Sequence, residues 1–312
     1  MSSPPPKKNL MIAKFGLILF CLLAGIYFSR SKKIPEGSHK IVNAWVINLA
    51  LPAVAIKYLP HIQLGQHLLL PAIAPVIVFA GGIIFVSLFL RRQAVDKATL
   101  AGMMLMAGLG NTGFVGLPLV AAYFGKDNLG TAVILDQSTV LLFSTVGAYI
   151  AISASGKGKV TASALLLKLV RFPPLVASLL SISLLRIIDI SEIQPLVNDI
   201  AATTAPLALF SIGLQLKFND IRSQIGQASP VLIYKLILAP ALCTIVALLF
   251  NFKGIHAQIS IFQMSMPSLL SAAVIANEYD LNPKLINLIA ASSIVLGLIT
   301  SCFWYFVGSF AT

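Results

Sequence analysis

The sequence GNTGFVGLP, residues 110–118, places a polar stretch, broken by glycine and ended by proline, inside a segment otherwise apolar enough to cross a bilayer. Hydrocarbon offers no water to backbone N–H and C=O groups. Non-helical backbone at that depth must therefore be paired within the protein, in a wet cavity or by a ligand. Asn111 lies near the middle of the segment, and Gly113, Gly116 and Pro118 follow it. The stretch predicts a broken helix that forms part of a binding site.

The composition around this stretch is that of a membrane protein. Of the 312 residues, 58% are hydrophobic and 10% are charged, and the mean hydropathy is +0.92. A spanning helix needs about 20 mostly apolar residues, and glycine, proline and charged residues divide the chain into ten such segments. We predict an all-α polytopic membrane protein with spans at residues 10–28, 38–57, 67–90, 98–124, 129–152, 162–185, 194–216, 228–251, 256–277 and 285–309.

Lysine and arginine alternate between the two sides of these spans. Loops after odd-numbered spans hold twelve of them, and the opposite side holds six. Because cytoplasmic loops are enriched in positive charge, we expect a plasma-membrane protein with the richer side in the cytoplasm and both termini outside it. The twelve are Arg30, Lys32, Lys33, Lys40, Arg91, Arg92, Lys97, Lys157, Lys159, Lys217, Arg222 and Lys284.

Several functional classes are not expected from the sequence. It contains no P-loop, no paired-cysteine metal spacing, no metalloprotease helix motif and no G-x-S-x-G elbow. We therefore expect no enzyme, no cofactor, no metal site and no transport driven by ATP on this chain. The net charge of +12 follows the alternation between loops, so nucleic acid is not an expected partner.

The order of the spans predicts two repeats of five helices each. A hydrophilic stretch, residues 153–161, divides the chain in the middle, so we expect repeats at 1–155 and 156–312. An odd number of spans per repeat gives the two halves opposite orientations, which is common in secondary transporters whose sites form where discontinuous helices meet. Residues 48–52 of the second span match residues 203–206 of the seventh, and Pro118 matches Pro267.

The matching prolines lie at two predicted breaks, in the fourth and ninth spans. Proline is favoured at the first position of a helix, so we expect Pro118 and Pro267 to begin the second half-helices. Two helix N-termini would then supply partial positive charge and free N–H groups to an anion. The carbonyl ends near Asn111 and Gln263 would suit a cation or a polar group. The alternative for each break is a proline kink that serves packing alone.

Ionisable residues inside the membrane are costly and often functional. Asp136 lies about two turns into the fifth span, where it could take up a proton, help to hold a cation or be purely structural. Lys235 lies about two turns into the eighth span and either snorkels to the interface or serves the site.

Four ordered motifs resemble the auxin efflux carrier family, which includes the plant PIN-formed carriers and bacterial malonate-type permeases. They are residues 43–52 (NAWVINLALP), residues 108–125 (GLGNTGFVGLPLVAAYFG) with 132–137 (AVILDQ), residues 205–216 (APLALFSIGLQL), and Met266-Pro267 ahead of residues 276–279 (ANEY). The resemblance covers nearly the whole chain. The central loop is far shorter than in the plant members, as expected of a minimal, prokaryotic-type form.

The resemblance implies ten helices in two inverted repeats, with the discontinuous fourth and ninth helices crossed as in bile-acid symporters and sodium-proton antiporters. It also implies scaffold helices 1, 2, 6 and 7, transport helices 3–5 and 8–10, elevator-like alternating access, an organic-anion substrate and a homodimer. The expected substrate-binding residues are Asn111, Thr112, Gly113, Pro118, Gln263, Ser265, Met266 and Pro267, with Asp136, Gln137 and Asn48 in coupling or support.

Coupling stays open at this stage. Proton symport through Asp136, sodium binding at carbonyls near Asn111 and downhill transport on the membrane potential are all compatible with the sequence. A sodium-coupled symporter of the bile-acid type is one alternative, although Gln263, Ser265 and Met266 stand where that family has an acidic residue. A cation/proton antiporter is another, and it would need an acidic pair at the crossing that this chain lacks.

Overall fold

The computed structural model of the chain describes residues 8–31, 33–91, 95–156, 163, 167, 170–216 and 221–312. Within these residues the fold is helical, and the one extended pairing is a bridge between Gly110 and Ser268. Most of the central loop predicted at residues 153–161 lies outside the described residues. So do five of the loop cations, Lys32, Arg92, Lys157, Lys159 and Lys217.

The chain forms two compact units, each built from segments that are not consecutive in sequence. Unit 1 combines residues 1–63, 113–133 and 173–216. Its helical elements are α1 (Lys8–Arg30), α2 (His39–Trp45), η1 (Val46–Ala50), α3 (Leu51–Tyr58), α6 (Leu117–Tyr123), η4 (Lys126–Asn128), α10 (Pro173–Ser183), α11 (Gln194–Ala202) and α12 (Thr204–Gln215).

Unit 2 combines residues 64–112, 134–172 and 217–312. Its elements are η2 (Gln66–Leu68), α4 (Leu69–Leu90), α5 (Lys97–Gly108), most of α7 (Leu129–Leu142), η5 (Phe143–Gly147), α8 (Ala148–Ser155), α13 (Ile221–Ile233), η6 (Tyr234–Leu238), α14 (Ala239–Leu249), α15 (Ile255–Met264), α16 (Leu270–Glu278) and α17 (Pro283–Ala311). The turn η3 (Thr112–Gly116) runs from the end of one segment of unit 2 into unit 1.

Six described helices are long and apolar enough to cross a membrane, judged by length and composition. They run over His39–Tyr58, Gln66–Leu90, Lys126–Ser155, Gln194–Gln215, Gln224–Leu249 and Pro283–Ala311, within a few residues of six of the predicted spans. Leu249 and Phe310 are more than two-thirds exposed on such helices, as expected of surfaces that face lipid. The remaining four spans and the inverted repeat stay predictions.

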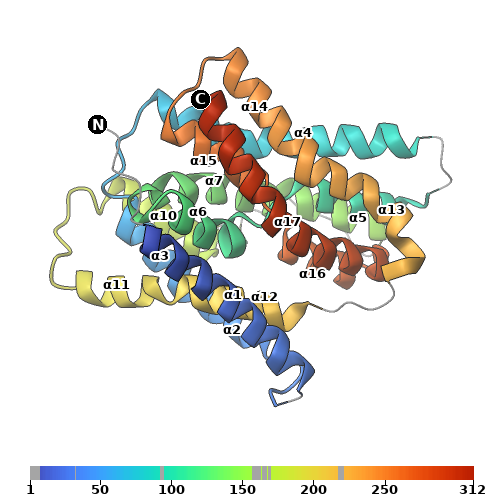
Figure 1. The fold of residues 1–312 in the computed structure, drawn as a ribbon, viewed down its shortest axis with the longest axis horizontal. Helices are drawn as coiled ribbons and strands as arrows, with labels where there is room; N and C mark the ends of the chain where they lie inside the picture. Colours follow the sequence, from blue (N-terminus) through green and yellow to red (C-terminus); the bar gives the residue numbers. More distant parts are fainter. Residues whose placement is uncertain are drawn as a thin grey trace. The chain divides into compact units, whose positions relative to one another are not determined.

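Helices α1 and α12 lie side by side in unit 1 (Figure 1), and glycine on each of them allows their backbones to touch. A Cβ atom added at Gly25 would come 2.2 Å from the carbonyl oxygen of Phe210, and one at Gly213 would come 2.3 Å from that of Leu22. Small residues at such contacts are typical of helix packing in membranes, where close approach takes the place of the hydrophobic effect.

Wide π-helical turns precede three prolines inside apolar helices. The turns η1, η3 and η6 each end two residues before a proline, at Pro52, Pro118 and Pro240 respectively. Proline lacks a backbone N–H, and local widening of the helix is one way in which the chain pairs the carbonyl that is left over. Helical structure is therefore continuous from Thr112 to Tyr123.

Candidate functional site

The first break begins where α5 ends against α4 in unit 2. At the start of α5, the Asp96 carboxylate accepts hydrogen bonds from the backbone N–H and the hydroxyl of Thr99, at 2.8 and 2.7 Å. These donors lower the pKa of Asp96, so the helix begins on a charged cap. At its end, a Cβ atom on Gly108 would come 2.3 Å from Cδ2 of Phe79. The backbone therefore lies directly on α4, and Leu109 leaves the helix with φ −98° and ψ 124°.

The second break separates α15 from α16, also in unit 2. α15 ends at Met264, and the carbonyl of Phe262 in its last turn accepts hydrogen bonds from both the N–H and the hydroxyl of Ser265, at 3.1 and 2.7 Å. α16 begins only at Leu270. Residues 265–269 are therefore not helical, and both interruptions predicted from the sequence are present.

The two breaks pair with each other through their backbones. The N–H of Asn111 donates to the carbonyl of Pro267 at 2.7 Å, and the N–H of Leu269 donates to the carbonyl of Leu109 at 3.0 Å. Gly110 and Ser268 face each other as an antiparallel bridge between these bonds. We call residues 109–112 and 265–269 the crossing. This pairing satisfies backbone groups that the broken helices leave free, as membrane depth requires.

Two buried serines fasten the crossing to the surrounding helices. The Ser268 hydroxyl donates to the carbonyl of Met106 in the last turn of α5 at 2.7 Å. The Ser268 N–H donates to the hydroxyl of Ser293 on α17 at 3.1 Å. Both serines are 0% exposed. They hold the extended segment in place with bonds that a simple proline kink would not need.

Asp136 reaches the crossing from α7. Its Oδ1 atom accepts a hydrogen bond of 2.6 Å from the hydroxyl of Thr112, and the two side chains are 4% and 0% exposed. The fifth predicted span thus places its carboxylate at the fourth span's break. The structure thereby brings together Asn111, Thr112, Asp136, Met266 and Pro267.

Gln263 stands in the last turn of α15, one residue before the helix ends. Its side chain is 0% exposed, and neither its amide oxygen nor its amide nitrogen has a hydrogen-bond partner in the part of the chain that the structure describes. The Oε1 atom of Gln137, next to Asp136, is also buried without a partner. A buried amide without partners costs free energy, so these groups are candidates for contact with a polar ligand.

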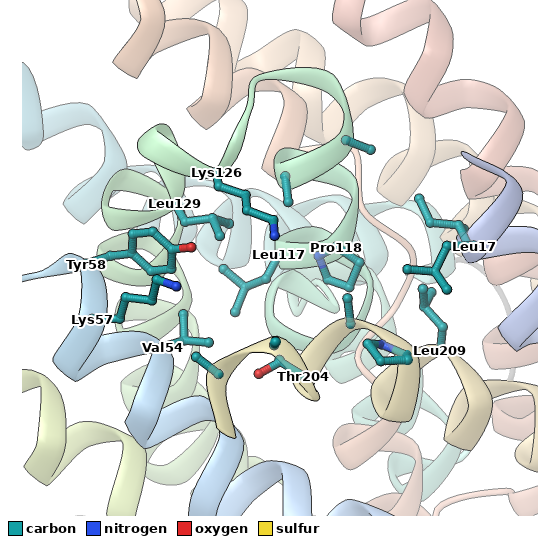
Figure 2. Close-up of a pocket in the computed structure, with 17 residues that line it drawn as sticks. Leu17, Val54, Lys57, Tyr58, Leu117, Pro118, Lys126, Leu129, Thr204 and Leu209 are labelled. Carbon is teal, nitrogen blue, oxygen red and sulfur yellow. The ribbon is translucent and has the colours of Figure 1, made fainter. Parts of the chain in front are cut away.

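Other predicted residues lie elsewhere. Gly113 belongs to the turn η3, and Pro118 lies in α6, where it lines a cavity of unit 1 (Figure 2). Asn48 is exposed in unit 1, and its Nδ2 donates to the carbonyl of Ala44 on its own helix. The expectation that the two prolines begin the second half-helices holds in part for Pro118, the second residue of α6, and is wrong for Pro267. Pro118 lies inside a helical run that starts at Thr112, and Pro267 is extended, three residues ahead of α16.

The cavity around Pro118 lies wholly in unit 1 and measures about 200 Å³. Figure 2 shows Lys57, Tyr58 and Lys126 gathered on one side of it, with apolar side chains such as Leu117 and Leu209 around the rest. The lysines line the cavity, and no acidic side chain does. The cavity is therefore mostly apolar, with two lysines and the hydroxyl-bearing Tyr58 and Thr204 among its lining residues.

Lys235 is the main residue that sequence reasoning undervalued. It does not snorkel to an interface, because it is 0% exposed, and its ammonium donates to the carbonyl of Met264 at 3.3 Å. A lone lysine in an apolar span was the available signal, but its burial depends on neighbours far away in sequence. Ser268 and Ser293 gave no signal, since serine is common in apolar helices.

Comparison with known proteins identifies the family of the chain. The model of the membrane transport protein family matches residues 10–305. The chain therefore belongs to that family, and the predicted resemblance to the auxin efflux carriers is confirmed.

The alignments with curated relatives cover most of this chain and most of each relative. An uncharacterized transporter of Methanocaldococcus jannaschii is 31% identical over 291 residues, 90% of this chain and 92% of the relative. An uncharacterized transporter of Methanothermobacter thermautotrophicus is 28% identical over 298 residues, 92% and 95% of the two chains. A protein named as a putative malonate transporter in Rhizobium meliloti is 25% identical over 284 residues, 87% of this chain and 86% of the relative.

Proposed function

We propose that this membrane transporter is a secondary carrier that moves a small organic anion with a carboxylate group across the plasma membrane. The anion binds at the crossing, and transport proceeds by elevator-like alternating access. The observation that carries the proposal is the backbone pairing of two interrupted helices at Asn111–Pro267 and Leu109–Leu269. Such breaks at membrane depth are typical of transporter binding sites.

Helix ends around the crossing favour a negative charge. Helical structure restarts at Thr112 on one segment and at Leu270 on the other. The N-terminal turn of a helix carries partial positive charge and N–H groups without helical partners. Together with the buried amide of Gln263, these groups offer hydrogen-bond donors to a carboxylate.

The cavity of unit 1 also fits an anionic solute. Lys57 and Lys126 both line it, and Figure 2 shows their amino groups on the same side of the space. Clefts lined by one sign of charge concentrate ligands of the opposite sign. The relative named as a putative malonate transporter is consistent with a carboxylate substrate.

A cation/proton antiporter is the second candidate. Asp136 favours it, since a buried carboxylate at the crossing is the group such a carrier would use. The fit is incomplete, because an antiporter would need a pair of acidic residues at the crossing, and Asp136 is a single carboxylate there. The proposed anion carrier further includes a homodimer, both termini outside the cytoplasm, and separate scaffold and transport helices.

Uptake by purified protein in proteoliposomes tests the function. Radiolabelled organic acids are offered with a pH gradient, a sodium gradient or a membrane potential imposed one at a time. We expect accumulation of at least one carboxylate under a pH gradient or a membrane potential. Exchange of protons for sodium without movement of any acid would favour the antiporter. A complete lack of acid uptake under all three conditions would overturn the proposed function.

A further inference from the structure

Lys235 buries its side-chain amine against both segments of the crossing. Its side chain, in the turn η6, is 0% exposed. The ammonium donates to the carbonyl of Met264 at 3.3 Å. On the other segment, a Cβ atom added to Gly110 would lie 3.0 Å from Nζ and 3.4 Å from Cε. Glycine at position 110 leaves the room that this side chain fills.

The ammonium has no carboxylate partner in the described part of the chain. Asp136, the buried acid at the crossing, is bonded to Thr112 and not to Lys235. An isolated charge is expensive to bury, so some other feature must make this position favourable for a cation. The structure offers one, the ends of two helices.

The end of α15 lies beside Lys235, and so does Gly110, which follows the end of α5. α5 ends at Gly108, two residues before Gly110, and α15 ends at Met264, whose carbonyl accepts from the ammonium. The C-terminus of a helix carries about half a negative charge and up to four carbonyls without helical partners. The Met264 carbonyl at the end of α15 and the space beside Gly110, two residues past the end of α5, together make a position suited to a single positive charge. A free cation bound there would need the same oxygen atoms.

We propose that the ammonium of Lys235 is a built-in cation that occupies this position permanently and takes the place of a coupling ion. Lys235 is then a positioning residue: it neutralises the two helix C-termini and keeps the crossing in shape for the substrate. As far as it concerns transport, this inference rests on the proposed function. It adds that organic-anion uptake does not require sodium, because the ammonium already engages the Met264 carbonyl oxygen and fills the space beside Gly110.

Removal of the side chain should expose the cation site. Lys235→Ala leaves a space and two uncompensated helix ends, into which a small cation can enter. Lys235→Met fills most of the space without charge, so it should block entry. Lys253→Ala is the matched control, because Lys253 is exposed in the loop before α15 and its loss changes the net charge equally.

The primary measurement is thermal denaturation of the purified proteins at one ionic strength in choline, sodium or methylammonium chloride. We expect the melting temperature of Lys235→Ala to rise by about 2 °C or more in sodium or methylammonium relative to choline, by mass action. The wild type, Lys235→Met and Lys253→Ala should melt at the same temperature in all three salts. Uptake by Lys235→Ala should be several-fold lower than wild type and should recover in part with the same cations.

The outcomes separate this inference from the proposed function. A melting temperature of Lys235→Ala that is equal in all three salts would overturn the built-in cation. An absolute requirement for sodium in wild-type uptake would also overturn it. This measurement uses the wild type alone, so it tests the inference even if the variants do not fold. If the wild type moves no organic acid but Lys235→Ala responds to cations, the proposed function fails and the assignment of Lys235 stands.

Discussion

Replacement of Gln263 by methionine should make the protein more stable and a poorer transporter at once. Methionine has nearly the volume of glutamine but no amide. In the wild type the amide oxygen and nitrogen are both buried without partners, and a buried polar group in that state costs about 1–3 kcal/mol. Gln263→Met removes that cost, so it should raise the free energy of unfolding by about the same 1–3 kcal/mol.

The expected gain depends on how well methionine fits. The side chain is 0% exposed in a packed helix end, and volume-conserving exchanges usually cost less than about 1.5 kcal/mol. The net expectation is a rise of a few degrees in melting temperature. If Gln263 binds the substrate, uptake in proteoliposomes should fall about tenfold or more, the loss expected for one hydrogen bond to a charged group.

Gln194→Met serves as the control, because the Gln194 amide already donates to Asn198 on the same helix of unit 1. It should raise neither stability nor KM. A lower melting temperature for Gln263→Met would refute the reasoning, since it would mean that the native amide has partners. Higher stability with unchanged uptake would remove Gln263 from the site and leave it an unsatisfied core residue.

Three further predictions concern the cavity, the helix packing and a helix cap. The double exchange Lys57→Gln and Lys126→Gln should raise the KM for an anionic substrate several-fold and weaken its dependence on ionic strength, because the cavity loses its charge; equal kinetics to wild type across a salt series would contradict this. Gly213→Ala should lower the free energy of unfolding by about 1–3 kcal/mol, since the new Cβ would lie 2.3 Å from a backbone oxygen. Gly226→Ala, inside α13 with open space around it, should instead raise it by about 0.5–1 kcal/mol in the same denaturation assay. Asp96→Ala should destabilise α5 by about 1 kcal/mol at neutral pH. Thr99 lowers the pKa of Asp96, so the cap is intact at any pH above the ordinary aspartate pKa of about 4 and is lost as the pH falls through the lowered pKa. The melting temperatures of variant and wild type should therefore converge only in strong acid.

The breaks were predictable because their causes are local. Glycine, proline and polar residues in the stretch 110–118 and at Met266-Pro267 disfavour a continuous helix wherever they occur in an apolar span. The long spans were equally accessible, since hydropathy over 20 residues needs no knowledge of neighbours. The sequence marked Asp136 as a residue of coupling or support, and the structure adds its hydrogen bond to Thr112 at the crossing.

Other features depend on contacts between distant segments. Pro267 is compatible both with a helix start and with extended backbone, and its pairing with Asn111 across the chain selects the second. Lys235 can snorkel in isolation, but the helix ends at Gly108 and Met264 give it a buried position. No local pattern distinguishes these cases, so they emerge only from the folded structure.

The central claim is that an organic anion binds at the crossing, and substrate counterflow tests it most directly. Proteoliposomes are loaded with an unlabelled carboxylate, and entry of the labelled acid is followed without any ion gradient, so the result does not depend on coupling. Asn111→Ala is compared with Asn277→Ala, which removes an exposed amide bonded to Asn287. The account predicts counterflow in the wild type and in Asn277→Ala, and at least a tenfold loss in a folded Asn111→Ala protein. Equal counterflow in all three proteins, or none with any carboxylate, would contradict it.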